Sequence, residues 1–245
     1  MSYKVIQSRS NPYFKNQRGM KPGFDEPLIL VEGVKLIGEA LSAGLSAKTQ
    51  WFCDEPYQGL DCLSYKIGAD MYGAISPTRS GNPPLIVFER PLIQNASEIK
   101  FGRYLLLDQV QEPGNAGALV RAAAAFGFDG AIWKRPCVYP FHHACIRASA
   151  GAVFHLPQFL LEDGALPTGL AFIGASTNAT HDLTTFQWPQ NMVLVMGNEG
   201  HGLSEETERH ISSQVRIPIN PAIESLNVSG AAHIFMYHIS QNTSK

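Results

Sequence analysis

The sequence predicts an α/β protein made of two units, a small one over residues 1–97 and a larger one over residues 98–245. Three observations predict this class. Short apolar runs alternate with helical patterns along the chain. Segments rich in glycine and amide side chains follow three of the predicted strands, where open α/β sheets usually bind ligands. The stretch RPLIQNASEIK (90–100) has no clear periodicity, so the boundary is expected there.

The first unit begins with an expected strand and an expected helix. PLILVEG (27–33) is a continuous apolar run typical of a strand. VKLIGEALSAG (34–44) has apolar residues at helical spacing and ends in Gly44, which suits a helix C-terminus. Two further strands are expected at TQWFC (49–53) and at PLIVFER (84–90), the second after a segment rich in proline and glycine.

The second unit repeats this alternation and favours a mainly parallel sheet. RYLLLDQV (103–110) predicts a buried strand, and NAGALVRAAAAFG (115–127) predicts a helix with Asn115 near its cap. Ser204 is expected to cap a helix whose first turn is acidic. Further strands are expected at GAIW, AFIGAS, MVLVMG and VRIPI, and the closing helix is expected to bury Leu226, Val228, Ala231, Ala232, Phe235, Met236 and Ile239.

Composition describes an ordinary globular protein, with 44% hydrophobic and 10% aromatic residues. The chain has neither an N-terminal signal pattern nor an apolar run of membrane-spanning length, so no membrane partner is expected. The four cysteines form no CxxC pair. Reduced thiols and a cytoplasmic location are therefore expected.

Charge is unevenly distributed along a chain whose formal net charge is only −2. Residues 1–24 contain no Asp or Glu, and such a segment is able to contact phosphates. A solvated N-terminus is the alternative, which charge alone favours. The basic residues of this segment are Lys4, Arg9, Lys15, Arg18 and Lys21.

Three segments combine glycines with Asn or Ser just after a predicted strand: QEPGNAGALVR (111–121), MGNEGHGLS (196–204) and IPINPAIESLNVSGAA (217–232). Glycine lets the backbone approach a ligand closely, and helix ends offer unpaired amides. Taken singly, each segment is better interpreted as a tight turn than as a ligand-binding loop. GNEGHG does not match GxGxxG, because Glu199 occupies the position of the second glycine, and no GxxxxGK[ST] is present.

Together these segments resemble the three motifs of the SpoU (TrmH-like) family of RNA 2′-O-ribose methyltransferases. Asn115, Gly117 and Arg121, followed by AAAAFG, match the first motif, and the segments 196–204 and 217–232 resemble the second and third. RASAGAVFHLP (147–157) is similar to a segment that these proteins carry between the first two motifs. SRSNPYFK and LILVEGVKLIGEAL resemble the small domain that precedes the catalytic domain in many members.

The resemblance implies a SPOUT-type catalytic domain with a C-terminal trefoil knot, preceded by a small α/β RNA-binding domain. It implies S-adenosylmethionine as the cofactor, contacted by Gly197, Ile217 and Leu226, and a homodimer formed through the knot region. Gly230 is expected to permit close helix packing. RNA is the expected partner, with ribosomal RNA preferred to transfer RNA because the two-unit arrangement resembles that of ribosomal RNA members.

The catalytic set implied by the resemblance is Asn115, Arg121, Glu199, Ser225 and Asn227. An arginine keeps its proton, so Arg121 is expected to hold the phosphate beside the target ribose and stabilise the developing alkoxide. Glu199 is expected to orient Asn115, Arg121 or the knot loops. Asn115 and Ser225 are also plausible helix caps, which is compatible with catalysis.

Other functions stay open at this stage. An RNA-binding or ribosome-assembly factor that kept the fold and lost catalysis is one alternative, and a transfer RNA 2′-O-methyltransferase is another. A Rossmann oxidoreductase lacks its glycine fingerprint. CVYPFHHAC (137–145) places two thiols and two histidines close together, but no second ligand cluster accompanies it and no metal is expected.

Overall fold

The first unit is a mixed sheet flanked by short helices. The structure, a computed structural model, describes residues 2–162, 166–198 and 200–242. Its elements up to residue 89 are β1 (Lys4–Val5), α1 (Pro12–Gly19), β2 (Leu28–Glu32), α2 (Val34–Ser42), β3 (Ala47–Phe52), β4 (Leu63–Lys66), α3 (Ala69–Tyr72) and β5 (Leu85–Glu89). The strand order is β1-β4-β3-β5-β2, with β4 parallel to both neighbours and β5 antiparallel to β2 and β3.

The basic N-terminal segment is folded into this unit by a few apolar residues, while its five basic side chains are exposed to solvent. Asn11 caps α1 by accepting a hydrogen bond from the backbone amide of Tyr13, and a proline follows at the first helical position. Ile6 and Phe14 are buried in the core of the unit. The distribution of charge along the sequence gives no sign that these two apolar residues are buried.

The second unit contains an eight-stranded sheet whose strand pairs are all parallel among the described residues. The predicted parallel sheet is thus confirmed. Its strands are β6 (Ile93–Asn95), β7 (Arg103–Asp108), β8 (Gly130–Lys134), β9 (Gln158–Leu161), β10 (Ala171–Ala175), β11 (His181–Asp182), β12 (Met192–Met196) and β13 (Ser213–Arg216). They lie in the order β11-β13-β10-β12-β7-β8-β9-β6. Since β6 pairs with β9, this sheet starts at residue 93.

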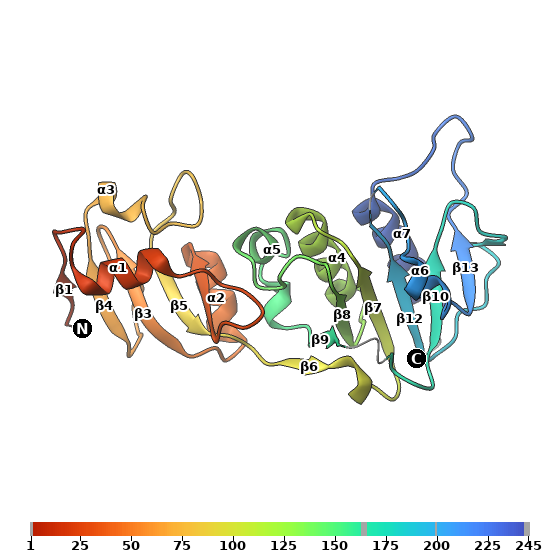
Figure 1. Cartoon of the computed structure of the whole chain (residues 1–245), viewed down its shortest axis with the longest axis horizontal. Helices are drawn as coiled ribbons and strands as arrows, with labels where there is room; N and C mark the ends of the chain where they lie inside the picture. The colour runs from red at the N-terminus through yellow and green to blue at the C-terminus, as the bar shows by residue number, and fades with distance from the viewer. Residues whose placement is uncertain (1, 163–165, 199, 243–245) are drawn as a thin grey trace.

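Helices cover this sheet and join it to the first unit. They are the short 3₁₀ turn η1 (Ala96–Glu98), α4 (Pro113–Ala125), α5 (His143–Ala148), the 3₁₀ turn η2 (Ala152–Phe154), α6 (Glu205–Glu208) and α7 (Val228–Asn242). α5 contacts both α4 and β2, and a single buried cluster runs from Ile29 and Ile37 to Leu105 and Phe235. Figure 1 shows α5 between the first unit and α4.

Helices α4 and α5 approach each other closely at Gly117, whereas no such approach occurs at Gly230. A methyl group on Gly117 would meet the α5 backbone at Cys145 and Ser149, so only glycine lets α4 and α5 touch there. A methyl group on Gly230 would meet nothing within 4 Å. The expectation that Gly230 serves close packing is therefore wrong, because this residue is exposed on the first turn of α7.

The helix caps differ in part from those expected. Ser204 caps α6 as predicted, with Glu205 and Glu206 in the first turn. Glu112 caps α4 through a hydrogen bond from the backbone amide of Asn115, which is itself the third helical residue. Asn115 was expected near the cap, but Pro113 suits the first helical position and starts the helix earlier.

The start of the closing helix also differs in its cap residue. α7 begins at Val228, and Asn227 accepts hydrogen bonds from the backbone amides of Ser229 (2.9 Å) and Gly230 (3.4 Å). Asn227, rather than Ser225, therefore caps this helix. No helix in the described part of the chain is both long enough and apolar enough to cross a membrane.

Candidate functional site

A cavity of about 480 Å³ opens at the carboxyl ends of β10, β12 and β13. Figure 1 shows the segment between β13 and α7 rising above this edge of the sheet. The cavity walls come mainly from three stretches that are far apart in the sequence: residues 175–178, residues 196–198 with 201–203, and residues 217–231. Parallel strands bring such stretches together, because their carboxyl ends all meet at one edge.

Most of the predicted site residues line this cavity. Gly197, Ile217 and Leu226, the residues expected to contact a cofactor, are all in its wall. Ser225 and Asn227 of the expected catalytic set lie beside them. The structure therefore gathers five of the eight predicted positions around one space.

The other three predicted positions lie outside the described cavity wall. Asn115 reaches it through Asn227, whose Nδ2 donates to Asn115 Oδ1 over 3.4 Å. Arg121 is exposed on α4, and its side chain forms no hydrogen bond or ion pair with any residue that the structure describes. Glu199 lies outside the described residues.

The turn that follows β12 is a narrow backbone loop. The backbones of Asn198 and Gly202 exchange two hydrogen bonds of 2.8 and 2.9 Å, and Asn198 Nδ2 donates to the carbonyl of Gln109 (3.0 Å). A side chain on Gly197 would collide with the backbone of Gly202 and Leu203. This wall is therefore built from the main chain, and its shape requires a residue without Cβ.

Beneath this loop lies a buried charged group that sequence reasoning missed. Lys134, at the end of β8, donates to the hydroxyls of Ser204 and Thr207 (both 2.7 Å) and pairs with Asp108 (3.4 Å) at the end of β7. Asp108 also accepts from the backbone amide and the hydroxyl of Ser204 (2.7 and 3.0 Å). The sequence does contain a sign of this group, because the apolar strands β7 and β8 each end in a charged residue, Asp108 and Lys134.

This group fixes the far end of the loop to the sheet. Lys134 reaches outward to Glu206 as well (3.0 Å), and this hydrogen bond lowers the pKa of the Glu206 carboxyl. The Asp108 side chain has no exposed surface and that of Lys134 is only 7% exposed. Buried charges are tolerated when each is paired and hydrogen-bonded. Because Ser204 supplies some of these hydrogen bonds, it fixes this end of the loop that lines the cavity.

The cysteine- and histidine-containing segment 137–145 shows no metal-binding arrangement. Burial raises the pKa of both Cys137 and Cys145 to about 12, so these thiols stay protonated at neutral pH. In the described ranges, no group of three or more His, Cys, Asp or Glu side chains is placed to hold a metal ion.

Together the parallel sheet, the narrow glycine loop and the main-chain cavity define a methyltransferase of the SPOUT class. The chain belongs to the SpoU rRNA Methylase family, whose family model matches residues 102–237. The expected family and the expected SPOUT-type α/β fold are thus confirmed, while the trefoil knot and the RNA-binding role of the first unit stay predictions.

Similar proteins extend the match beyond the second unit. The 23S rRNA (guanosine(2553)-2'-O)-methyltransferase RlmP of Bacillus subtilis is 26% identical, over 96% of this chain and 99% of its own. An uncharacterized tRNA/rRNA methyltransferase of Synechocystis is 36% identical over 54% of this chain, a match that spans 51% of that protein.

Solved structures agree over nearly the full length. The crystal structure of an AdoMet-bound rRNA methyltransferase from Sinorhizobium meliloti has a TM-score of 0.84 and 26% identity, and it covers 99% of both chains. Both units of this protein thus have counterparts in one solved structure.

Proposed function

We propose that this protein transfers a methyl group from S-adenosylmethionine to a ribose 2′-hydroxyl in RNA, with ribosomal RNA as the preferred substrate. One observation carries the proposal: the second and third motif segments meet around a single cavity that contains Gly197, Ile217 and Leu226, and Asn227 in its wall donates to Asn115 of the first motif. The names of the Bacillus subtilis relative and of the Sinorhizobium meliloti structure support both the reaction and the cofactor.

The cavity fits such a cofactor in size and in chemistry. Its volume of about 480 Å³ falls within the roughly 300–1,000 Å³ typical of small-molecule sites. Gly197, Ile217 and Leu226 would hold the cofactor largely through main-chain groups, while the hydroxyl and amide side chains in the wall offer donors and acceptors. The missing Cβ of Gly197 lets its backbone pack directly against that of Gly202 and Leu203, which shapes this side of the wall.

The reaction requires alignment, a good leaving group and an exit for one proton. S-adenosylmethionine supplies, when bound, a methyl group on a positively charged sulfur, which becomes a neutral thioether when the methyl carbon bonds to the ribose 2′-oxygen. Asn115 and Asn227 are proposed to position the substrate and the loops beside it. The hydroxyl proton is proposed to pass to the neighbouring phosphate or to solvent.

Arg121 is proposed to bind the phosphate next to the target ribose and to stabilise the developing alkoxide. Its planar guanidinium suits bidentate contact with phosphate oxygens, and it keeps its proton throughout. Its exposure and its lack of partners among the described residues leave it available for RNA. Glu199 is proposed to orient this set.

A homodimer is proposed, formed through α7 and the proposed trefoil knot. α7 exposes Ile234 (41%) and Tyr237 (57%) on its outer face, although its inner face is fully buried. Because Arg121 does not line the cavity of its own chain, a dimer also offers the partner subunit's Arg121 a way to reach it. Ile234→Glu is expected to shift the protein to monomers by light scattering and to reduce activity. A variant that stays dimeric would contradict the proposed interface.

The proposed location is the cytoplasm, in keeping with four cysteines that are all unpaired. The second candidate function, an RNA-binding factor without catalysis, is disfavoured by the intact Asn115, Asn227 and Arg121.

Labelled methyl transfer to unmodified ribosomal and transfer RNA, followed by nucleoside analysis, tests these proposals. Label on a ribose 2′-oxygen of ribosomal RNA is expected. Label on transfer RNA alone would overturn the substrate preference, and label on a base would overturn the reaction. If the cofactor failed to bind, the non-catalytic function would replace the methyltransferase.

A further inference from the structure

A second cavity, of about 450 Å³, lies between the two units and takes no part in the site described above. Its walls are the end of β2 with the first turn of α2, the loop of residues 77–82, and one face of α5. The first two come from the N-terminal unit and the third comes from the catalytic unit. The cavity therefore exists only when both units are packed together.

Its charged lining is predominantly basic. Lys35 on α2 and Arg147 on α5 are both exposed, and neither side chain forms an ion pair or hydrogen bond with any residue in the described ranges. Arg79 extends from the same 77–82 loop and is likewise exposed. His143 is half-buried beside Arg147. Lys35 and Arg147 line the same cavity from two different helices, so both positive charges face one space, whereas Arg79 lies outside the cavity lining.

The acidic residue of the lining, Glu32, is already engaged in hydrogen bonds within the protein. Its carboxylate is buried and accepts hydrogen bonds from three hydroxyl groups. They are those of Tyr72 (3.0 Å), Ser76 (2.6 Å) and Thr78 (2.6 Å). Glu32 therefore holds the 77–82 loop in place from below, and this loop presents Ser80 and Asn82 to the cavity.

The position of this cavity relative to the methylation site is fixed. α5, which carries His143 and Arg147, packs on α4 through the side-chain-free surface of Gly117. α4 in turn carries Asn115 and Arg121. In Figure 1 the loop between α3 and β5, then α5 and α4, then the segment before α7 follow one another along the upper side of the molecule. A single polynucleotide strand on this side would pass both cavities.

We propose that this cavity is a binding subsite for the sugar–phosphate backbone of the substrate RNA, in which Lys35 and Arg147 contact phosphate. Its described lining contains no Phe, Tyr or Trp on which a base could stack. Its cations, hydroxyl and amide groups are instead those that contact phosphate and sugar. The subsite positions the RNA and carries no sequence information. This inference rests on the proposed function.

Two of the five cations of the basic N-terminal segment are already engaged within the first unit. Arg9 donates to the carbonyl of Asp70 (3.0 Å) and lies 3.7 Å from its carboxylate, while Lys4 lies over the ring of Tyr13 at 5.3 Å. Both cations are thus engaged within the first unit. The interdomain cavity offers cations without such partners.

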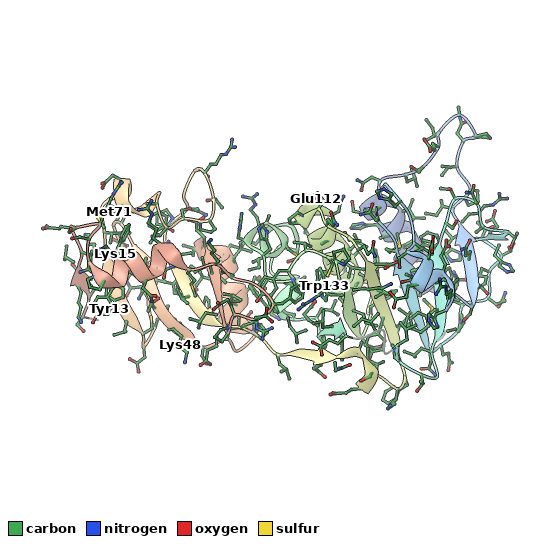
Figure 2. The ribbon with its side chains drawn as sticks, viewed as in Figure 1. Tyr13, Lys15, Lys48, Met71, Glu112 and Trp133 are labelled. Atoms are coloured by element: carbon green, nitrogen blue, oxygen red, sulfur yellow. The ribbon has the colours of Figure 1, made fainter. Side chains whose placement is uncertain are left out.

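The test compares Lys35→Ala, Arg147→Ala and the double variant with Lys48→Ala in the full-length protein. Lys48 is a matched control, because it lies on the opposite, lower edge of the first unit in Figure 2 and pairs with Glu89. The RNA is the unmodified ribosomal RNA that the wild-type protein methylates. Dissociation constants are measured at several salt concentrations, together with KM, kcat and cofactor affinity.

Each single variant is expected to weaken RNA binding by about 5- to 10-fold and to reduce the salt slope by roughly one. KM for RNA should rise while kcat at saturating RNA and cofactor affinity stay unchanged, which a merely structural role would not produce. If Arg147→Ala does not fold stably, the same measurements are made on Arg147→Met and Lys35→Ala instead. RNA affinity and salt slope unchanged in the double variant would overturn the subsite. A wild-type protein that binds RNA but methylates none would instead overturn the proposed function.

Discussion

The side-chain amide of Asn227 donates to Oδ1 of Asn115 over 3.4 Å, and so joins the start of α7 to the first turn of α4. The two residues are 112 positions apart in the sequence. The same Asn227 uses its Oδ1 to cap α7. One amide therefore does two things: its oxygen stabilises a helix, and its nitrogen holds the residue that begins the Asn115–Arg121 motif.

Asn227→Asp and Asn227→Ala should separate these two roles. Asp keeps the capping oxygen but has no N–H to donate, so methyl transfer should fall while stability is kept. Ala removes both, and should also cost about 1 kcal/mol of unfolding free energy. Urea titration and initial rates check this. Full activity in the Asp variant would show that the contact with Asn115 plays no part in catalysis.

Gly197→Ala is expected to weaken cofactor binding by on the order of tenfold or more, since 1.4 kcal/mol of strain is enough for that change. The added methyl group would push against the backbone of Gly202 and Leu203. Gly230→Ala is the control, because a methyl group there meets nothing within 4 Å. Calorimetric titration with S-adenosylmethionine measures both. Equal affinities in the two variants would exclude a tight main-chain wall at Gly197.

Arg121→Lys and Arg121→Ala should both lose methyl transfer while they retain cofactor affinity, because Lys keeps the charge but not the planar fork. If the partner subunit's Arg121 completes the site, mixing Arg121→Ala with Gly197→Ala protomers should restore part of the activity, since one of the two cavities then has an intact set. Near-normal rates for Arg121→Lys would exclude bidentate contact. Mixtures without any gain would place Arg121 in its own chain's site.

Lys134→Met is expected to lower the unfolding free energy by about 3–5 kcal/mol, because it leaves the buried carboxylate of Asp108 without its cation. Lys48→Met removes an exposed ion pair with Glu89 and should cost about 0–1 kcal/mol. Denaturant unfolding compares the two, and cofactor titration reports on the loop that Ser204 anchors. Equal losses in both variants would mean that the buried group does not stabilise the fold.

Stability should decrease as pH falls from about 7 towards 5. Burial lowers the pKa of His142 and His143; for His143, His142 and Arg147 lower it further while Glu32 opposes them. Below the ordinary histidine pKa of about 6.5, the unfolded chain therefore binds more protons than the folded one, which favours unfolding. His143→Gln should flatten this dependence in denaturant titrations. An unchanged slope in His143→Gln would contradict this cause.

Several parts of the fold were predictable because their signals are local. Continuous apolar runs located β7, β8, β10 and β12, and a serine before an acidic turn located α6. The short elements were not predictable in the same way. α1 and β4 have little periodicity of their own, and they are held by burial of residues such as Phe14 and Tyr65 against the rest of the first unit.

The sequence by itself determined the longer strands and helices, the three glycine-containing loops and the identity of the family, because each of these depends on residues that are close together along the chain. Only the tertiary structure decided which side chains meet. Asn115 with Asn227, Asp108 with Lys134, and Lys35 with Arg147 around one cavity are all pairs of residues on different elements. Their proximity follows from the register of parallel strands and the packing of helices on them, which no local pattern specifies.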